Sequence, residues 1–342
     1  MDQGLHSDDG VVVDQRRASN HLFGQHFTWK RADLRPRQWH VQLSDAAGAE
    51  LDTIADALAD YDDDIEGLVP DAFDWPATTE LMTDVAHRLH NGAGFAVLSR
   101  LPVERWGVPA TRCVAWLLTS LLGPIVHQKF KGARIYDVRD MGKSLAHGVR
   151  RSITNLEQEF HTDGGWLPET PEIIALACLR QAAQGGMSRV SSLATAHDLL
   201  RARAPDLLAR LYQPLWWDRQ AEHAAGDVPC SRRPIFSWQG ERPSARYYDD
   251  YVRQGHRLMG APLDEPAAAA LDALKTALEA PEHCFDFYLR PGEIEYVNNR
   301  VVAHARTNFE DADGTGEGRH LIRLWVRSTG GTALEPAAAM AD

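Results

Sequence analysis

The sequence lacks the marks of membrane, secreted and nucleic-acid-binding proteins. Its apolar runs stay well short of the roughly 20 residues that a membrane-spanning helix needs. The stretch from Met1 to His6 has neither the basic start nor the apolar core of a signal peptide. Lys plus Arg number 36 against 48 Asp plus Glu, a formal net charge of −12, which disfavours binding to nucleic acid or anionic membranes. We therefore expect a cytoplasmic protein with neither of these partners.

Cysteine is also scarce, and no Cys-x-x-Cys pair occurs among the four cysteines. We expect ordinary thiols in a reducing compartment, not a disulfide framework or a zinc site. No internal repeat and no Pro/Ser-rich linker divides the 342 residues. With 44% hydrophobic and 25% charged residues, the chain has the composition of a globular protein with a substantial core. Assembly into a homo-oligomer is left open by the sequence.

The distribution of residue types predicts one folded domain with an extension at each end. Residues 1–27 are polar and aperiodic and should form a mobile arm, and the Gly/Ala-rich residues 330–342 a flexible tail. Between them, residues 28–329 should form a single domain. Within it, the irregular segment 213–262, rich in Trp, Tyr, Arg and Pro, predicts an insertion or lid.

Helical patterns come early and strand patterns come late. Ser44 should cap a helix with an apolar stripe from Leu51 to Leu58, and later helices are expected over 78–90, 109–122, 195–203, 205–212 and from Asp264. Strands are expected over 94–98, 134–138, 172–180, 188–193, 283–290, 293–297, 301–308 and 319–327. This order fits an α+β fold built on a double-stranded β-helix, or jelly roll, with flanking helices.

The stretch Glu159-Phe160-His161-Thr162-Asp163-Gly164 carries the strongest chemical signal. In extended backbone, side chains two positions apart leave the same face, so His161 and Asp163 can point at one ion. The natural third ligand is His304, in Asn298-Asn299-Arg300-Val301-Val302-Ala303-His304. Two histidines and one carboxylate are the ligand set of non-haem iron(II) oxygenases.

Other motifs follow in a set order. Gly185-Gly186-Met187-Ser188 is a tight turn with a hydroxyl on the strand after it. A turn and an alternating strand, Pro291 to Asn299, precede His304. In a strand, Arg319 and Arg323 would share a face with Leu321, and a guanidinium buried there needs an anionic partner such as a carboxylate.

In this order, His-Thr-Asp, Gly-Gly-x-Ser, Asn-Asn-Arg-x-x-x-His-Ala-Arg-Thr and Arg-x-x-x-Arg-Leu-Trp resemble the taurine dioxygenase / 2,4-dichlorophenoxyacetate dioxygenase family. The resemblance covers about residues 90–327 and implies a clavaminate-synthase-like fold and an iron(II)- and 2-oxoglutarate-dependent oxygenase. Such an enzyme couples oxidative decarboxylation of 2-oxoglutarate, with O2, to hydroxylation, desaturation or cyclisation of a small molecule.

The resemblance also implies roles for single residues. His161, Asp163 and His304 would hold iron. Ser188, where the family usually has Thr, would bond a cosubstrate carboxylate, and Arg319 would clamp the distal carboxylate of 2-oxoglutarate. Arg323 would reach the edge of the cosubstrate or an anionic group of the substrate.

Two alternatives remain at this stage. One is a jelly-roll metalloenzyme that does not use 2-oxoglutarate, which would leave Arg319 and Ser188 without a purpose. The other is a degenerate, non-catalytic family member that acts as a binding protein, against which the complete ligand set argues.

The substrate is expected to be a small carboxylate-bearing molecule, an amino acid or a natural-product intermediate. One of the arginines near the site should then hold its anionic group. Against this, Arg300 and Arg306 could instead pair with Glu293, Glu295 or Glu310. Elsewhere we expect solvated side chains at Arg150 and Arg151, a surface or cap role for His197, and packing roles for Tyr247, Tyr248 and Tyr251. Trp166, Trp216 and Trp217 are candidates for an apolar pocket wall.

Overall fold

A computed structural model describes residues 23–61, 64–128, 132–144, 150–224, 226–239, 242–312 and 318–327. The expected tail, 330–342, and most of the expected N-terminal arm, 1–27, lie outside these residues. The described end of the arm is folded onto the domain. Phe23 is buried, with its ring centroid 5.8 Å from that of His197.

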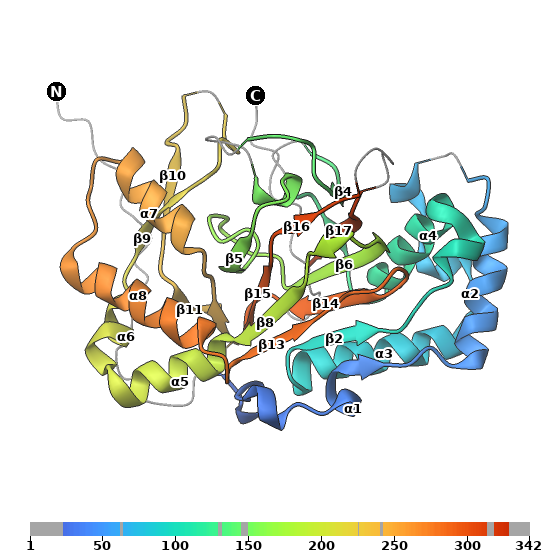
Figure 1. Cartoon of the computed structure of the whole chain (residues 1–342), viewed down its shortest axis with the longest axis horizontal. Coiled ribbons are helices and arrows are strands. Elements are labelled where there is room, and N and C mark those ends of the chain that lie inside the picture. Colours follow the sequence, from blue (N-terminus) through green and yellow to red (C-terminus); the bar gives the residue numbers. More distant parts are fainter. Residues whose placement is uncertain are drawn as a thin grey trace.

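The larger sheet of the structure carries the chain's most apolar strands. Its order is β1-β2-β14-β6-β17-β3, with β4 also paired to β17 (Figure 1). All pairings are antiparallel except that of β1 with β2. The strands are β1 His40–Val41, β2 Phe95–Leu98, β3 Ile125–Val126, β4 Ile135–Val138, β6 Ile173–Arg180, β14 Ile294–Asn298 and β17 His320–Val326.

A smaller antiparallel sheet, in the order β13-β8-β15-β5, faces the larger one. The facing is shown by a hydrogen bond that crosses between the sheets, from Ser188 of β8 to Glu295 of β14. Together the two sheets form the predicted double-stranded β-helix. The strands of the smaller sheet are β5 Gln158–His161, β8 Ser188–Ser192, β13 Cys284–Phe287 and β15 Val302–Arg306, and a short pair, β7 Gln184–Gly185 with β16 Phe309–Glu310, lies beside them.

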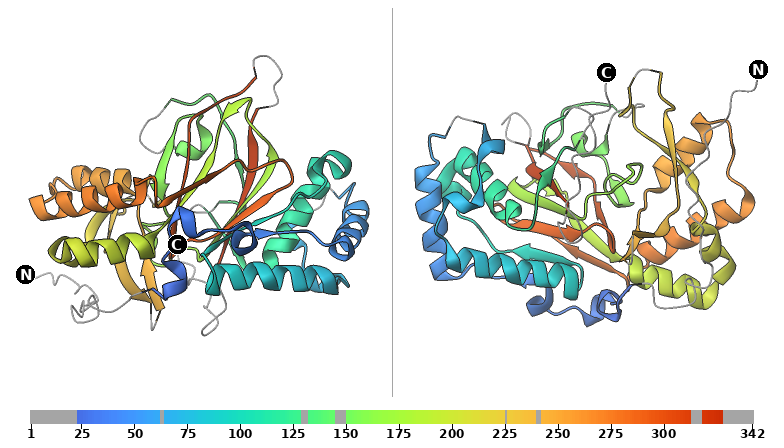
Figure 2. Two further views of the ribbon diagram at one scale, coloured as in Figure 1. Left: turned by 60° about the horizontal axis from the view of Figure 1, so that its bottom comes forward. Right: turned by 180° about the vertical axis from the view of Figure 1, so that it is seen from behind.

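Helices cover both outer faces, as Figure 2 shows from two sides. The first group packs its apolar stripes on the outer face of the larger sheet, against alternate residues such as Ala175, Ile294 and Ile322. The second group packs against the smaller sheet. The first group is α2 Asp45–Ala57, α3 Pro76–Asn91 and α4 Val103–Ser120; the second is α5 Leu193–Arg203, α6 Pro205–Leu211 and α8 Glu265–Glu279; the short α1 Pro36–Trp39 precedes β1.

Caps begin these helices where the sequence places polar side chains. The Ser44 hydroxyl accepts a hydrogen bond from the Ala47 amide, as predicted, and Asp264 accepts one from Ala267 at the start of α8. α4 begins six residues earlier than expected, because Gly107, at φ 76°, joins two helical segments across a kink. Among the described residues, no helix is both long and apolar enough to cross a membrane.

The segment 213–262 is more regular than its composition predicts. It contains two hairpins and a helix: β9 Leu215–Asp218 with β10 Cys230–Arg233, β11 Phe236–Gln239 with β12 Arg242–Ala245, and α7 Asp249–Leu258. Its core residues, among them Trp217, Phe236 and Tyr247, are fully buried. The expectation of an irregular segment is therefore wrong, since these aromatic residues pack into the core shared with the smaller sheet and its helices.

Gly292, in the turn before β14, provides a test of how this strand is held. Its φ is 87°, and a Cβ at this position would overlap the backbone carbonyl oxygen of Leu101. Gly142 has φ 64° with open space around it and is the matched control. We expect Gly142→Ala to lower the free energy of unfolding by about 1–2 kcal/mol, the cost of the left-handed backbone alone, and Gly292→Ala to lower it by more. Equal losses in urea unfolding would contradict the packing argument.

Candidate metal centre and adjoining pockets

His161 and His304 meet because their strands are paired in register. His161 ends β5, and His304 lies in β15 directly opposite it in the antiparallel ladder. Directly opposite residues of an antiparallel pair hold their side chains close together, and the two imidazole centroids are 4.3 Å apart. Asp163 follows two residues after His161, in the loop that leaves the strand. The structure thus brings His304 beside His161 and Asp163, which precede it in the sequence by more than a hundred positions.

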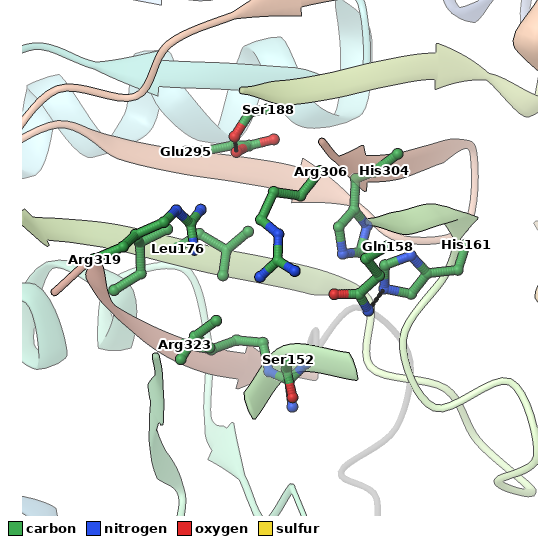
Figure 3. Close-up of a pocket in the computed structure, with 13 residues that line it drawn as sticks. Ser152, Gln158, His161, Leu176, Ser188, Glu295, His304, Arg306, Arg319 and Arg323 are labelled. Atoms are coloured by element: carbon green, nitrogen blue, oxygen red, sulfur yellow. Dashed lines mark hydrogen bonds between the residues drawn. The ribbon is translucent and has the colours of Figure 1, made fainter. Parts of the chain in front are cut away.

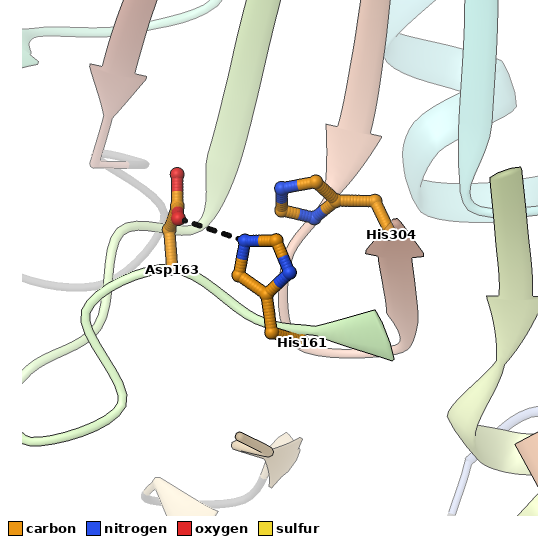
Figure 4. Close-up of side chains that lie close together, drawn as sticks. All are labelled: His161, Asp163 and His304. Carbon is orange, nitrogen blue, oxygen red and sulfur yellow. Dashed lines mark ion pairs between the residues drawn. The ribbon is translucent and has the colours of Figure 1, made fainter. Parts of the chain in front are cut away.

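The three side chains offer a compact set of donor atoms. One donor atom of each lies within 4.8 Å of the others, and His161 Nε2 is 3.5 Å from Asp163 Oδ1 (Figure 4). All three residues are buried, with exposed fractions of 3%, 6% and 7% in chain order. A buried cluster of this kind is costly unless its members are hydrogen-bonded or bind an ion.

The hydrogen bonds of His161 select which of its nitrogens is available. Its Nδ1 donates to the Glu159 carbonyl at 2.9 Å, which leaves Nε2 as the acceptor nitrogen facing Asp163. The Gln158 amide donates to that nitrogen at 2.8 Å. His304 Nδ1 is buried and has no hydrogen-bond partner among the described residues. Each histidine therefore has a nitrogen suited to a metal.

Asp163 is held in place from the larger sheet. Arg323 of β17 forms an ion pair with its Oδ2 at 3.1 Å, and the indole of Trp325 donates to the same oxygen at 2.9 Å. The Asn299 side chain accepts from the Asp163 amide and donates to its carbonyl. These contacts orient the carboxylate before any ion arrives, as outer partners of metal ligands do.

The protonation states of the cluster suit cation binding. Burial would raise the pKa of Asp163, but the positive charge of Arg323 holds that pKa well below its usual range. Burial, reinforced by His161, lowers the pKa of His304 to about 3. The site therefore offers a carboxylate and a neutral imidazole at neutral pH, the forms that bind metal. Two nitrogens and one carboxylate on one side of a buried site fit iron(II) and leave positions open.

A pocket adjoins the histidines and contains every other site residue that the sequence predicts. Ser188, Arg319 and Arg323 line it together with His161, His304 and Arg306, and Figure 3 shows Arg306 between Arg319 and the histidines. Leu321 also lines the pocket, which confirms that alternate residues of β17 share one face. The three arginines make this pocket suited to an anion.

The arginines differ in how far their charge is already neutralised. Arg323 is paired with Asp163. Arg319 is 5% exposed, and its Nη1 has no hydrogen-bond partner among the described residues. Arg306 donates to the carbonyls of Thr154 and Leu156, and burial, reinforced by Arg319, lowers its pKa to about 9. Arg319 is therefore the best placed of the three to bind an incoming carboxylate.

Glu295 is a member of this pocket that the sequence analysis did not assign to it. Its Oε2 accepts a hydrogen bond from Ser188 Oγ at 3.0 Å, and the residue is 1% exposed. Burial raises its pKa to about 7, against the opposing effects of Ser188 and Arg319. The alternative in which Arg300 and Arg306 pair with Glu293, Glu295 or Glu310 is not what the structure shows: Arg300 pairs with Glu172 at 3.4 Å, and Arg306 donates to the carbonyls of Thr154 and Leu156. A single acidic residue in the apolar strand Ile294 to Val297 was the available signal.

A second pocket also adjoins the metal centre and shares His161 and Arg323 with the first. His161, Asp163 and Arg323 line it together with Arg150, Trp166, Tyr248 and Tyr251. The expectation of a solvated Arg150 is wrong: it is 8% exposed, its Nη2 pairs with Glu222 at 2.6 Å, and its guanidinium lies 5.7 Å from the Trp166 ring centroid. Arg151 pairs with Asp250 at 2.9 Å.

Other aromatic and histidine residues also differ from expectation. Tyr248 and Tyr251 line this pocket, whereas Tyr247 is packed in the core. Trp217 is fully buried in the core, and neither it nor Trp216 lines the two pockets beside the metal centre. His197 is not a surface residue, since it is fully buried and its Nε2 lies 2.8 Å from the Tyr212 hydroxyl.

Comparison with known proteins agrees with this geometry. The model of the taurine catabolism dioxygenase TauD, TfdA family matches residues 64–325. The chain is 28% identical to FR-33289 synthase from Streptomyces rubellomurinus, over 89% of both chains, and 30% identical to L-asparagine oxygenase from Streptomyces coelicolor, over 74% of this chain and 76% of the relative.

A solved structure, asparagine oxygenase in complex with Fe(II), 2S,3S-3-hydroxyasparagine and succinate, superposes with a TM-score of 0.64 at 21% identity. The match covers 84% of this chain and 93% of that one, and it confirms the predicted fold.

The three-residue centre predicts the effect of removing one donor. We expect His304→Ala to keep its fold and to lose iron(II) binding by more than the roughly 10- to 100-fold that loss of an outer partner costs. His87, exposed on α3, supplies the control His87→Ala. Iron content after anaerobic reconstitution and gel filtration measures the loss. Full iron occupancy in His304→Ala would show that His304 is not an iron ligand.

Proposed function

The chain belongs to the taurine catabolism dioxygenase TauD, TfdA family, and we propose that His161, Asp163 and His304 are its iron ligands. It is an iron(II)- and 2-oxoglutarate-dependent dioxygenase, with O2 as the other cosubstrate. Bound iron supplies the activation of O2 that couples decarboxylation of 2-oxoglutarate to oxidation of a substrate C–H bond. The observation that carries the proposed ligand set is the buried, in-register pairing of His161 with His304 beside Asp163.

We assign 2-oxoglutarate to the pocket lined by Arg306, Arg319 and Ser188. The cosubstrate is a dianion, and its keto acid end must reach the metal while its distal carboxylate lies further away. The unpartnered Arg319 Nη1 supplies a charge-assisted donor at the far end of the pocket, and Leu176 and Leu321 supply an apolar wall for the methylene carbons. Arg323 contributes mainly by holding Asp163, which differs from the cosubstrate or substrate contact expected for it.

The substrate then belongs in the second pocket, which is lined by Trp166, Tyr248, Tyr251 and Asp163. Arg150 supplies an anion-binding group there, and its ion pair with Glu222, which does not line the pocket, holds its side chain in place. Tyr248 Oη is buried and has no hydrogen-bond partner among the described residues. An aromatic wall beside a guanidinium suits a small carboxylate-bearing molecule, which supports an amino acid or a derivative of one. The names of two relatives, L-lysine 3-hydroxylase and L-asparagine oxygenase, agree with this class.

The segment 213–262 supplies Tyr248 and Tyr251 to this pocket, and Glu222 as the ion-pair partner of Arg150. We propose that it is the part of the single domain that determines the substrate, through side chains that close one side of the pocket. A reducing, cytoplasmic location belongs to the same proposal, supported by four cysteines that are all free and buried in the structure.

The assignment of the cosubstrate pocket predicts a contrast between two arginines. We expect Arg319→Ala to raise the dissociation constant of 2-oxoglutarate by roughly ten- to a hundredfold, because the lost charge-assisted bonds contribute about 1.5–3 kcal/mol. Arg323→Ala should instead lower iron occupancy, since it releases Asp163. Anaerobic titration with 2-oxoglutarate, followed by its visible charge-transfer absorbance with iron(II), measures both. The reverse pattern would exchange the roles of the two residues.

The proposed substrate class is tested with matched compounds. Succinate formation should be faster with amino acids that carry a free α-carboxylate than with their methyl esters, because Arg150 gains a charged partner only from the acid. Arg150→Gln should lower turnover of the acids and leave that of the esters little changed. Equal turnover of acid and ester by the unaltered enzyme would contradict the proposal that Arg150 binds a carboxylate of the substrate. The oxygenase assignment would remain in place.

A further inference from the structure

Glu295 places an ionisable acid inside a pocket built for an anion. The residues opposite it in the sheet are apolar, Val97 on β2 and Leu176 on β6. Its Oε1 is buried without a hydrogen-bond partner, and it forms no ion pair with any residue in the described ranges. Beside it, Arg319 has an unpartnered Nη1 of its own. A bound carboxylate would therefore meet a favourable guanidinium and, if Glu295 is ionised, an unfavourable like charge in the same apolar enclosure.

The Ser188 hydroxyl links the charge of Glu295 to the hydrogen bonding of the pocket. A hydroxyl has one proton to donate, and an ionised carboxylate can only accept. When Glu295 is ionised, its carboxylate accepts a hydrogen bond from the Ser188 hydroxyl, as in the observed 3.0 Å contact. Ser188 then presents only lone pairs to the pocket. When Glu295 is protonated, it can donate a hydrogen bond to Ser188 Oγ. The Ser188 hydroxyl is then free to donate its own hydrogen bond to a bound anion. Protonation of Glu295 thus removes its repulsion of a bound carboxylate and also makes the Ser188 hydroxyl a hydrogen-bond donor to that carboxylate.

We propose that Glu295 makes cosubstrate binding proton-coupled: the protein takes up one proton from solvent, on Glu295, when the distal carboxylate of 2-oxoglutarate binds at Arg319 and Ser188. This rests on the proposed function, because it requires 2-oxoglutarate in that pocket. The proton stays on the protein during binding and returns to solvent when the dicarboxylate product leaves. Glu295 is a positioning residue in this role, since it acts through Ser188.

The direction of the pH dependence follows from the neighbouring groups. Burial raises the pKa of free Glu295 to about 7, and a bound anion raises it further. Below that pH the group is already protonated, so affinity for 2-oxoglutarate should not depend on pH. Above it, affinity should fall by up to about tenfold per pH unit. The other titratable groups facing the pocket are Cys178, whose buried thiol has a pKa raised to about 12, and Arg306, Arg319, Arg323, His161 and His304.

Calorimetry of 2-oxoglutarate binding to the anaerobic, iron(II)-loaded protein tests this without turnover. At about pH 8, above the pKa of free Glu295, titrations in two buffers of different ionisation enthalpy give the number of protons taken up. We expect an uptake approaching one per site. Glu295→Gln should abolish the uptake yet still bind, because its amide can donate to Ser188 as the protonated acid does. Glu295→Leu places a residue like its apolar neighbours at this position and should also abolish the proton uptake. This variant replaces Glu295→Gln in the experiment if Glu295→Gln does not fold.

The outcomes separate this inference from the assignment on which it rests. Binding without proton uptake, or equal uptake in Glu295→Gln, overturns the role of Glu295 and leaves the cosubstrate pocket in place. Absence of 2-oxoglutarate binding at every pH, in protein that has bound iron, overturns the pocket assignment itself. A dissociation constant that rises above neutral pH in the unaltered protein and stays flat in both variants supports the proposal.

Discussion

The ion pair between Asp163 and Arg323 connects the two halves of the jelly roll at the point where the chemistry takes place. Asp163 follows β5 of the smaller sheet, whereas Arg323 and Trp325 belong to β17 of the larger one. Two charges buried at this depth are stable only as a pair with further hydrogen bonds. Trp325 supplies such a bond to the carboxylate, and Asn299 fixes the backbone beside it. The relative position of the sheets and the orientation of the metal ligand are therefore set by the same contacts.

The rest of the interior between the sheets is divided by charge. In the pocket proposed for 2-oxoglutarate, Arg306 and Arg319 supply two positive charges, and in the second pocket the charge of Arg150 is paired with Glu222. The formal charge of the whole chain is −12, yet these pockets are rich in arginine. Long-range repulsion of polyanions and local capture of small acids can coexist, because screening confines exposed surface charge to about 10 Å while buried charges act at close range.

Many helix and strand positions, and the His161–Asp163 spacing in the proposed iron ligand set, could be anticipated because they depend on local order. Alternation along β17 places Arg319, Leu321 and Arg323 on one face whatever the surroundings. The errors arise where burial decides. Arg150 and His197 look like surface residues by type, but Arg150 is buried with Glu222 and His197 with Tyr212. The aromatic residues of 213–262 appear irregular in sequence, and only their mutual packing makes them two hairpins and a helix.

The sequence by itself determined the chemistry available to this protein: the spacing of His161 and Asp163, the second histidine at 304, and the turn and cap residues that begin strands and helices. Only the tertiary structure decided how those groups are used. It paired Ser188 with Glu295 across 107 residues and Asp163 with Arg323 across 160. Such partners follow from the register and facing of strands that are distant in the chain, and the protonation of Glu295 follows from the solvent those strands exclude. Local residue patterns carry no record of either.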